Sequence, residues 1–311
     1  MKLAFLYAGQ GTQSVGMGRD LYEQYPAFRE VMDSPAAGCD LKKLCFEGPD
    51  EVLAQTRWTQ PCVVAVEVGI TALLYAEGIR PQMAAGLSLG EYSALCAAGV
   101  FDVPTVLSVV AYRGRAMQKA SEGLSCGMTA VLGLSREPLL AACREASSLG
   151  TVEVTNYNCP GQMVISGERE AVKKAGELAL KAGAKRCVPL KLSGPFHSSM
   201  MAPAGRALAG LFPSVSFGEM QFPVIFNATG RPKQPGETIP KLLEKQVQSG
   251  VLFEDTIRYM EQAGIDTALE IGPGKILSGF VRRTARSIKT YSAENAEGLR
   301  EVIRTLKGGG A

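Results

Sequence analysis

Short apolar runs alternate with longer amphipathic stretches along most of this 311-residue chain. Five of the apolar runs have the length of buried strands, and a stretch of helical character follows each of them: 3–8, 83–85, 224–227, 267–271 and 288–291. Repeated strand–helix alternation is typical of a mostly parallel sheet with helices on both faces. The larger part of the chain is therefore predicted to have an α/β fold.

One helical stretch, residues 62–77, is apolar nearly all round and is predicted to be buried against the sheet, with residues 58–61 opening it. No run approaches the roughly 18 apolar residues that a membrane span requires. Residues 1–8 imitate the start of a signal peptide, but residues 9–13 interrupt the apolar run too early. We therefore expect a first core strand there and no membrane association.

The order of predicted strands and helices changes between residues 124 and 192. The predicted order there is strand, helix, strand, strand, helix, strand, at 128–132, 137–147, 152–156, 163–166, 168–182 and 186–190. This order is that of the ferredoxin-like split motif. The chain is therefore predicted to form a large α/β domain from 1–123 and 193–311, which carries an inserted ferredoxin-like α+β subdomain at 124–192. The glycine-rich tail at 308–311 is expected to fray.

Composition and charge argue against several classes of protein. The net charge is +3 and no Lys/Arg run exceeds two residues, so no nucleic-acid partner is expected. Eight cysteines include no C-x-x-C pair, as expected of small core residues in a reduced, cytoplasmic compartment. The only histidine, His197, excludes a histidine-rich zinc site, and we expect neither a metal nor a bound cofactor.

Residues 86–91 read GLSLGE and place Ser88 in a G-x-S-x-G pentapeptide. In a nucleophile elbow, the glycines permit a strained turn between a strand and a helix, with the serine hydroxyl at its apex. The context fits, because the apolar run 83–85 precedes Ser88 and the helix-favouring stretch 91–98 follows it. Ser88 is therefore the candidate nucleophile, with a structural turn as the alternative. The elbow makes the larger domain α/β-hydrolase-like.

A second copy of the pentapeptide occupies residues 123–127 and contains Ser125. Here the helical pattern 103–119 comes before the serine and the strand-like run 128–132 comes after it. This order is the reverse of a nucleophile elbow, so Ser125 is predicted to lie in a loop.

Five stretches together resemble one family, the malonyl-CoA:acyl carrier protein transacylases of bacterial fatty acid synthesis, which are related to the acyltransferase domains of polyketide and fatty acid synthases. The stretches are GQGTQ at 9–13, GLSLGE at 86–91, YRGR at 112–115, GPFHS at 194–198 and EIGPG at 270–274. The resemblance covers essentially the whole chain.

The resemblance implies that Ser88 is acylated, and that His197 takes its proton and then returns it to the departing coenzyme A thiol. A serine hydroxyl is a poor nucleophile at neutral pH, so an adjacent base must activate it. The alternative for His197 is a satisfied core histidine. The resemblance also implies an oxyanion hole at the backbone N–H groups of Gln10 and Leu89. Elbow geometry requires Leu89 independently, whereas the loop around Gln10 has a second interpretation as a simple turn.

Two positions depart from the family pattern. The family usually has histidine just before the nucleophile, where this chain has Leu87. It also often has glutamine in the stretch that matches 250–253, where a main-chain carbonyl orients the catalytic histidine. We assign this role to the carbonyl of Leu252, because a carbonyl survives replacement of the side chain. Asp255 and Glu270 are the acidic alternatives.

The resemblance also implies how the substrates are recognised. Arg113 matches the arginine that pairs with the free carboxylate of malonyl, a role that suits the planar fork of a guanidinium. Arg115, two residues away on a helix, must face a different direction, so only one of the two can enter the cleft. Phe196 would narrow the pocket against a methyl branch.

Docking of the partner is predicted from charge. Acyl carrier proteins are acidic, and the cationic pairs Lys185–Arg186 and Arg282–Arg283 are candidates for docking one. The alternative for these pairs is a solvated charged face.

The predicted function is transfer of malonyl from malonyl-CoA to Ser88 and then to the phosphopantetheine thiol of acyl carrier protein. This ping-pong acyltransferase would feed fatty acid biosynthesis, and a monomer is expected. The alternatives are a serine thioesterase or esterase, an acyltransferase of a polyketide pathway, and a non-catalytic binding subunit that kept the fold.

Overall fold

The computed structural model describes residues 1–190 and 194–308. The chain forms two compact units, the first from Met1–Arg115, Val215–Ile225 and Arg258–Ala311, and the second from Ala116–Ser214 and Phe226–Ile257. The division at 124 and 192 stays a prediction. Its downstream boundary at 192–193 and the tail residues 309–311 lie outside the described residues.

A parallel sheet with the strand order β10-β9-β1-β2-β7 forms the centre of the first unit. The strands are β1 (Leu3–Tyr7), β2 (Met83–Gly86), β7 (Val224–Phe226), β9 (Thr267–Ile271) and β10 (Lys289–Ala293). Each pairing between neighbours in this order is parallel. All residues of the central strand β1 and of its neighbours β2 and β9 are buried. The predicted parallel α/β sheet is confirmed.

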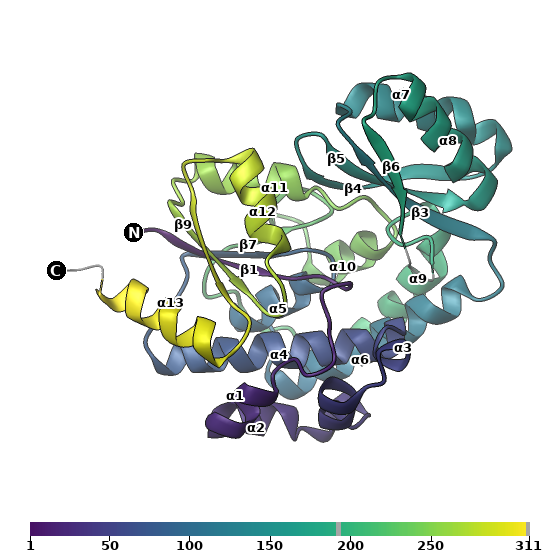
Figure 1. Ribbon diagram of the computed structural model, residues 1–311. Helices are drawn as coiled ribbons and strands as arrows, with labels where there is room; N and C mark the ends of the chain where they lie inside the picture. The colour runs from purple at the N-terminus through teal and green to yellow at the C-terminus, as the bar shows by residue number, and fades with distance from the viewer. Residues whose placement is uncertain (191–193, 309–311) are drawn as a thin grey trace. The chain divides into compact units, whose positions relative to one another are not determined.

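Helices cover both faces of this sheet. The connection from β1 to β2 runs through α4 (Thr56–Ala76), and the connection from β9 to β10 runs through α12 (Ile276–Thr284). These crossovers leave the middle of the sheet in opposite directions, and because crossovers between parallel strands are right-handed, the two helices cover opposite faces. Figure 1 shows α4 and α5 (Gly90–Ala97) on one side of β1 and α12 on the other.

The order of strands reverses between β1 and β9, and ligands of open α/β sheets bind outside the carboxyl ends of strands at such a point. The other described elements that begin in this unit lie around the sheet. They are α1 (Arg19–Gln24), α2 (Pro26–Met32), η1 (Pro35–Ala37), η2 (Lys43–Glu47), α3 (Asp50–Leu53), α6 (Val103–Ser121) and α13 (Ala296–Gly308).

Helix α4 begins at Thr56, so the prediction that residues 58–61 only lead into a helix starting at Cys62 is wrong. A proline inside a helix costs about 3 kcal/mol, but Thr56, Thr59 and Gln60 before it are all fully buried, and tertiary packing outweighs this cost. In the described part of the chain, α4 is the one helix long and apolar enough to cross a membrane. Its most apolar window is 83% buried inside the protein, as in a core helix.

An antiparallel sheet of order β4-β5-β3-β6 organises the second unit. Helices α7 (Arg136–Ala146) and α8 (Arg169–Lys181) pack against each other (Figure 1) over a core that includes Leu139 and Ile165. The strands are β3 (Cys126–Leu132), β4 (Val152–Cys159), β5 (Gln162–Glu168) and β6 (Arg186–Pro189). The chain order β3-α7-β4-β5-α8-β6 confirms the ferredoxin-like motif.

The second unit extends beyond this motif. Helices α9 (Ala202–Leu211) and α10 (Ile239–Val247) pack against each other. The other described elements that begin there are η3 (Ser147–Leu149), η4 (Ser199–Met201), η5 (Phe212–Ser214), β8 (Arg231–Pro232) and α11 (Phe253–Gln262).

Candidate active site

Ser88 lies in a sharp turn between strand β2 and helix α5, with a backbone φ of 54°. The flanking glycines are required by contact with the backbone. A Cβ atom on Gly86 would lie 1.9 Å from the carbonyl carbon of Gly90, and a Cβ atom on Gly90 would lie 2.2 Å from the carbonyl oxygen of Tyr7. The predicted strand–turn–helix geometry of a nucleophile elbow is present.

The second pentapeptide has the reversed surroundings predicted for it. Ser125 lies between the end of α6 and the start of β3 at Cys126. A Cβ atom on Gly127, its last glycine, would meet nothing within 4 Å. The two copies of the pentapeptide thus have the same sequence pattern but different geometry. In the first copy the glycines lie in close contact with neighbouring backbone, whereas Gly127 in the second does not.

Arg113 is fully buried on α6 and reaches Ser88. Its Nη2 donates to the Ser88 Oγ at 3.2 Å, and its Nη1 donates to the Oε1 of Gln60 at 2.9 Å. The guanidinium also lies over the ring of Tyr92, 5.2 Å from its centroid. Burial lowers the pKa of Arg113 from its ordinary value, but a guanidinium stays protonated in proteins. Arg115 is exposed, as expected if only one arginine can face Ser88.

Gln60 is a site residue that was not predicted from the sequence. It belongs to the stretch that leads into Pro61, which we interpreted only as the opening of a helix. A glutamine before a helix-breaking residue carries no signal of its own. Its contact with Arg113, 53 positions away in the chain, exists only in the folded protein.

The loop after β1 carries Gln10, whose Nε2 donates to the Oγ1 of Thr56 at 3.0 Å. This loop lies against the residue before the nucleophile, since a Cβ atom on Gly9 would come within 2.8 Å of the Leu87 carbonyl oxygen and 3.4 Å of its side chain. Leu89 is fully buried at the start of α5. The two backbone segments assigned to the oxyanion hole are thus held close to the elbow.

His197 belongs to the second unit and has a backbone φ of 62°. Its side chain is buried, as is that of the neighbouring Phe196. Among the described residues, Ser88 and His197 are the two non-glycine residues with positive φ. Strained backbone of this kind clusters at functional sites.

The carbonyl that orients His197 is that of Gln246, 2.8 Å from Nδ1. The assignment of this role to Leu252 is therefore wrong. The Leu252 carbonyl instead accepts hydrogen bonds from the backbone N–H and the Oγ1 of Thr256 in the first turn of α11. A glutamine carbonyl does hold the imidazole, but it lies on α10, six residues before the position that we matched.

The acidic alternatives have other partners. Asp255 forms an ion pair with Arg136 at 3.0 Å. Glu270 accepts hydrogen bonds from the backbone N–H groups of Leu277 and Ser278 at 2.9 and 2.7 Å. Glu270 therefore caps the first turn of α12, which is a structural role.

The four cationic residues proposed for docking are all exposed. Lys185 and Arg186 lie at the start of the edge strand β6 in the second unit. Arg282 and Arg283 lie in the last turn of α12 in the first unit, where Arg282 donates to the Oγ1 of Thr290 at 3.2 Å.

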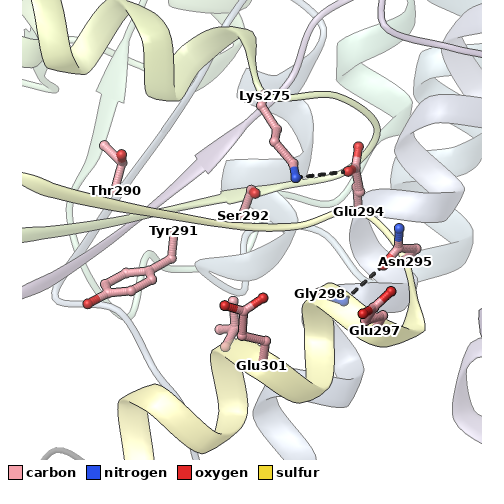
Figure 2. A pocket seen from close by; sticks show the side chains of 10 residues that line it. Lys275, Thr290, Tyr291, Ser292, Glu294, Asn295, Glu297, Gly298 and Glu301 are labelled. Carbon is pink, nitrogen blue, oxygen red and sulfur yellow. Dashed lines mark hydrogen bonds and ion pairs between the residues drawn. The ribbon is translucent and has the colours of Figure 1, made fainter.

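A pocket of about 430 Å³ lies beside β10 and α13, and Figure 2 shows the side chains that line it. Among these, Lys275 and Glu294 form an ion pair of 3.3 Å, and Glu297 and Glu301 lie along α13. None of the site residues predicted from the sequence lines this pocket. Within residues 1–190 and 194–308, no group of three or more His, Cys, Asp or Glu is placed to hold a metal ion, and none of the eight cysteines forms a disulfide.

Comparison with known families identifies the class of protein. The family described as acyl transferase domain matches residues 4–307, and the chain belongs to this family. Its relatives include the malonyl CoA-acyl carrier protein transacylase of Bacillus subtilis (strain 168), which is 39% identical over 309 residues, 98% of each chain. The chain is an acyltransferase, and its resemblance to malonyl CoA-acyl carrier protein transacylases is confirmed.

Solved structures give the same result. The malonyl CoA-acyl carrier protein transacylase from Clostridium perfringens superposes with a TM-score of 0.95 at 38% identity, over 99% of this chain and 98% of that one. A malonyl-transacylase solved in complex with a type II PKS acyl-carrier protein gives a TM-score of 0.94 at 36% identity, over 98% and 100% of the two chains.

Proposed function

We propose that this acyltransferase carries malonyl from malonyl-CoA to the phosphopantetheine thiol of acyl carrier protein, through a malonyl ester on Ser88. The observation that carries the proposal is the buried Arg113 guanidinium, 3.2 Å from the Ser88 Oγ. A cation beside a nucleophile suits an acyl group that ends in a carboxylate. Relatives named malonyl CoA-acyl carrier protein transacylase support the same donor and acceptor.

In the proposed reaction, His197 is the general base. A carbonyl oxygen can only accept, so the contact with Gln246 places a proton on Nδ1. In this tautomer Nε2 is the ring nitrogen that can accept the Ser88 proton. The Ser88 Oγ forms a bond to the thioester carbonyl carbon, the C–S bond breaks, and His197 returns the proton to the coenzyme A thiol. The carrier-protein thiol then repeats the sequence in reverse.

Oxyanion stabilisation is assigned to the backbone N–H groups of Leu89 and Gln10. Removing one donor from such a hole typically costs about 10²- to 10³-fold in kcat. The tight packing of Gly9 against Leu87 and the Gln10–Thr56 hydrogen bond support this assignment, because fixed donors lose little in reorganisation. Phe196 is assigned to the acyl pocket, where it disfavours a methyl branch.

Two other functions remain as alternatives. A thioesterase would use the same Ser88 and His197 but would release the acyl group to water. A polyketide pathway is favoured by one observation, since a structural relative at 36% identity was solved with a type II PKS acyl-carrier protein. We propose fatty acid biosynthesis as the pathway, and a cytoplasmic monomer that needs no metal or bound cofactor.

Intact-mass measurement tests the proposal directly. Incubation with malonyl-CoA should add one malonyl group to the wild type and to Ser125→Ala, which changes the serine of the second pentapeptide, but not to Ser88→Ala. The isolated acyl-enzyme should then lose malonyl faster to holo acyl carrier protein than to buffer. Faster release to water would favour the thioesterase, and no adduct at all would leave a non-catalytic subunit.

A further inference from the structure

Glu67 is a fully buried carboxyl group on helix α4 that the proposed reaction does not use. Burial raises its pKa well above the ordinary value, while the hydrogen bond from the Ser93 hydroxyl partly opposes this shift. Placing an acid in a core is costly unless it is hydrogen-bonded, and among the described residues Oε2 has a hydrogen-bond partner whereas Oε1 has none. The segments packed around this carboxyl group therefore show what it stabilises.

The first partner joins Glu67 to the nucleophile helix. The Ser93 Oγ donates to the Glu67 Oε2 at 2.5 Å. Ser93 lies on α5, five residues after Ser88, and is itself fully buried. This contact fixes the helix whose first turn forms the elbow.

The second neighbour is the segment that leads to Gln10, because the main chain of Ala8 lies close enough to the Glu67 carboxyl group to oppose the rise in its pKa. Ala8 ends the buried run of β1 and directly precedes Gly9 and Gln10. The same segment touches the elbow, since a Cβ atom on Gly90 would lie 2.6 Å from the carbonyl oxygen of Ala8. A displacement of Ala8 would therefore move the proposed oxyanion donor at Gln10 relative to Ser88.

The third contact explains a sequence motif that the reaction leaves without a role, EIGPG at 270–274. A Cβ atom on Gly272 would lie 2.7 Å from the Cγ and 3.0 Å from the Oε1 of Glu67. Gly272 also has a φ of 108°, which favours glycine. The turn after β9 therefore packs directly against the Glu67 carboxyl group, and a glycine at position 272 is needed for this contact.

These three segments follow β2, β1 and β9, which are neighbours in the sheet, at the carboxyl ends where the site is built. We propose that Glu67 is a positioning residue that fixes the spacing between the nucleophile at Ser88 and the oxyanion donor at Gln10. The inference rests on the proposed function, in which these two groups act on the same carbonyl.

Single-turnover acylation by malonyl-CoA tests the role, with circular dichroism and thermal melts to measure the folded fraction. Glu67→Leu removes the polar contacts and should slow acylation per folded molecule by about 10-fold or more, because misplacement by 1 Å can cost about 10²-fold. The KM for malonyl-CoA should change by less than about 3-fold, because Arg113 is untouched. Glu67→Gln keeps the shape and the hydrogen bond with Ser93 and should stay within about 3-fold of the wild-type rate.

Thr71→Val is the matched control. Thr71 lies one turn along α4 and is buried, and its Oγ1 is hydrogen-bonded to the Tyr7 hydroxyl and the Glu67 main-chain carbonyl; neither of these two hydrogen bonds joins the elbow. This variant should lose stability yet acylate at the wild-type rate per folded molecule. If it slowed acylation as much as Glu67→Leu, general loosening of the core would explain both, and the proposal would be overturned.

If Glu67→Leu fails to fold, Ser93→Ala provides the test instead, because it removes only the hydroxyl that donates to Glu67. It should slow acylation by about 3-fold or more, and an unchanged rate would overturn the proposal, as would a normal rate in folded Glu67→Leu. Failure of the proposed function would be distinguishable from failure of this inference, because the wild-type protein itself would then form no malonyl adduct on Ser88.

Discussion

Arg113 decides, in the proposed function, which acyl group is chosen. Acetyl would leave its buried guanidinium without a carboxylate, and truncating one partner of such a pair costs on the order of 2 to 5 kcal/mol. Arg113→Ala should therefore lower kcat/KM for malonyl-CoA by about 10²-fold or more, while acetyl loading stays level or rises. Arg115→Ala, on the exposed side of the same helix, should change neither. A malonyl preference that survives in Arg113→Ala would falsify this role.

A single residue, Glu67, is also expected to make the free energy of unfolding depend on pH. Buried Glu270 adds to the rise in its pKa, and the Tyr7 hydroxyl is a second titratable neighbour. The unfolded chain loses this proton near pH 4.3, whereas the folded chain keeps it to higher pH. The stability contributed by Glu67 is therefore present at low pH and declines as pH rises.

Glu67→Gln has no proton to lose in either state. Its melting temperature, measured relative to that of the wild type, should rise from about pH 5 to about pH 9. Thermal melts of both proteins across this range measure the difference. A difference that stays constant with pH would show that the carboxyl is already ionised in the folded protein.

At the scale of elements, the elbow depends on how closely β1 approaches α5. Gly90→Ala would press a methyl group against two main-chain carbonyl oxygens, at 2.2 and 2.6 Å, which no side-chain movement can relieve. We expect a loss of about 1 to 3 kcal/mol in the free energy of unfolding, together with slower acylation. Denaturant unfolding measures the first effect.

Gly127→Ala is the control in the second pentapeptide, where the added methyl group meets nothing. It should be neutral or slightly stabilising, because alanine restricts the unfolded chain more than glycine does. If Gly90→Ala and Gly127→Ala lowered the free energy of unfolding equally, close contact with the backbone would not be the reason that glycine is needed at position 90.

At the scale of the whole molecule, the predicted docking of a carrier protein depends on exposed charges. If Lys185 and Arg186 attract an acidic carrier protein, reversing both charges should raise its apparent KM. The effect should be smaller at high salt, where charges more than about 8 Å apart are screened, and acylation by malonyl-CoA should be unchanged. Reversal of Lys173 and Lys181, two exposed lysines on α8 of the same unit, is the matched control. Equal loss in both half-reactions would indicate damaged folding instead.

Much of the architecture was predictable from local pattern. We could predict the parallel sheet, the ferredoxin-like motif and the elbow at Ser88 from periodicities of two and 3.6 residues and from the spacing of glycines. These patterns involve only residues that are close together in the chain. The start of α4 was missed for the same reason. Locally Pro61 indicates a boundary, and only burial on both sides of it keeps the helix intact.

The amino-acid sequence alone specifies which chemical groups are present: one histidine, one serine in an elbow, and an arginine that the family resemblance assigns to a carboxylate. The partners of these groups are set by the fold. Gln246 holds His197 across 49 positions, and Gln60 holds Arg113 across 53. Such contacts depend on where separate segments meet in space, and a carbonyl or an amide can make them from many positions, so the residues leave no local signal of which one is used.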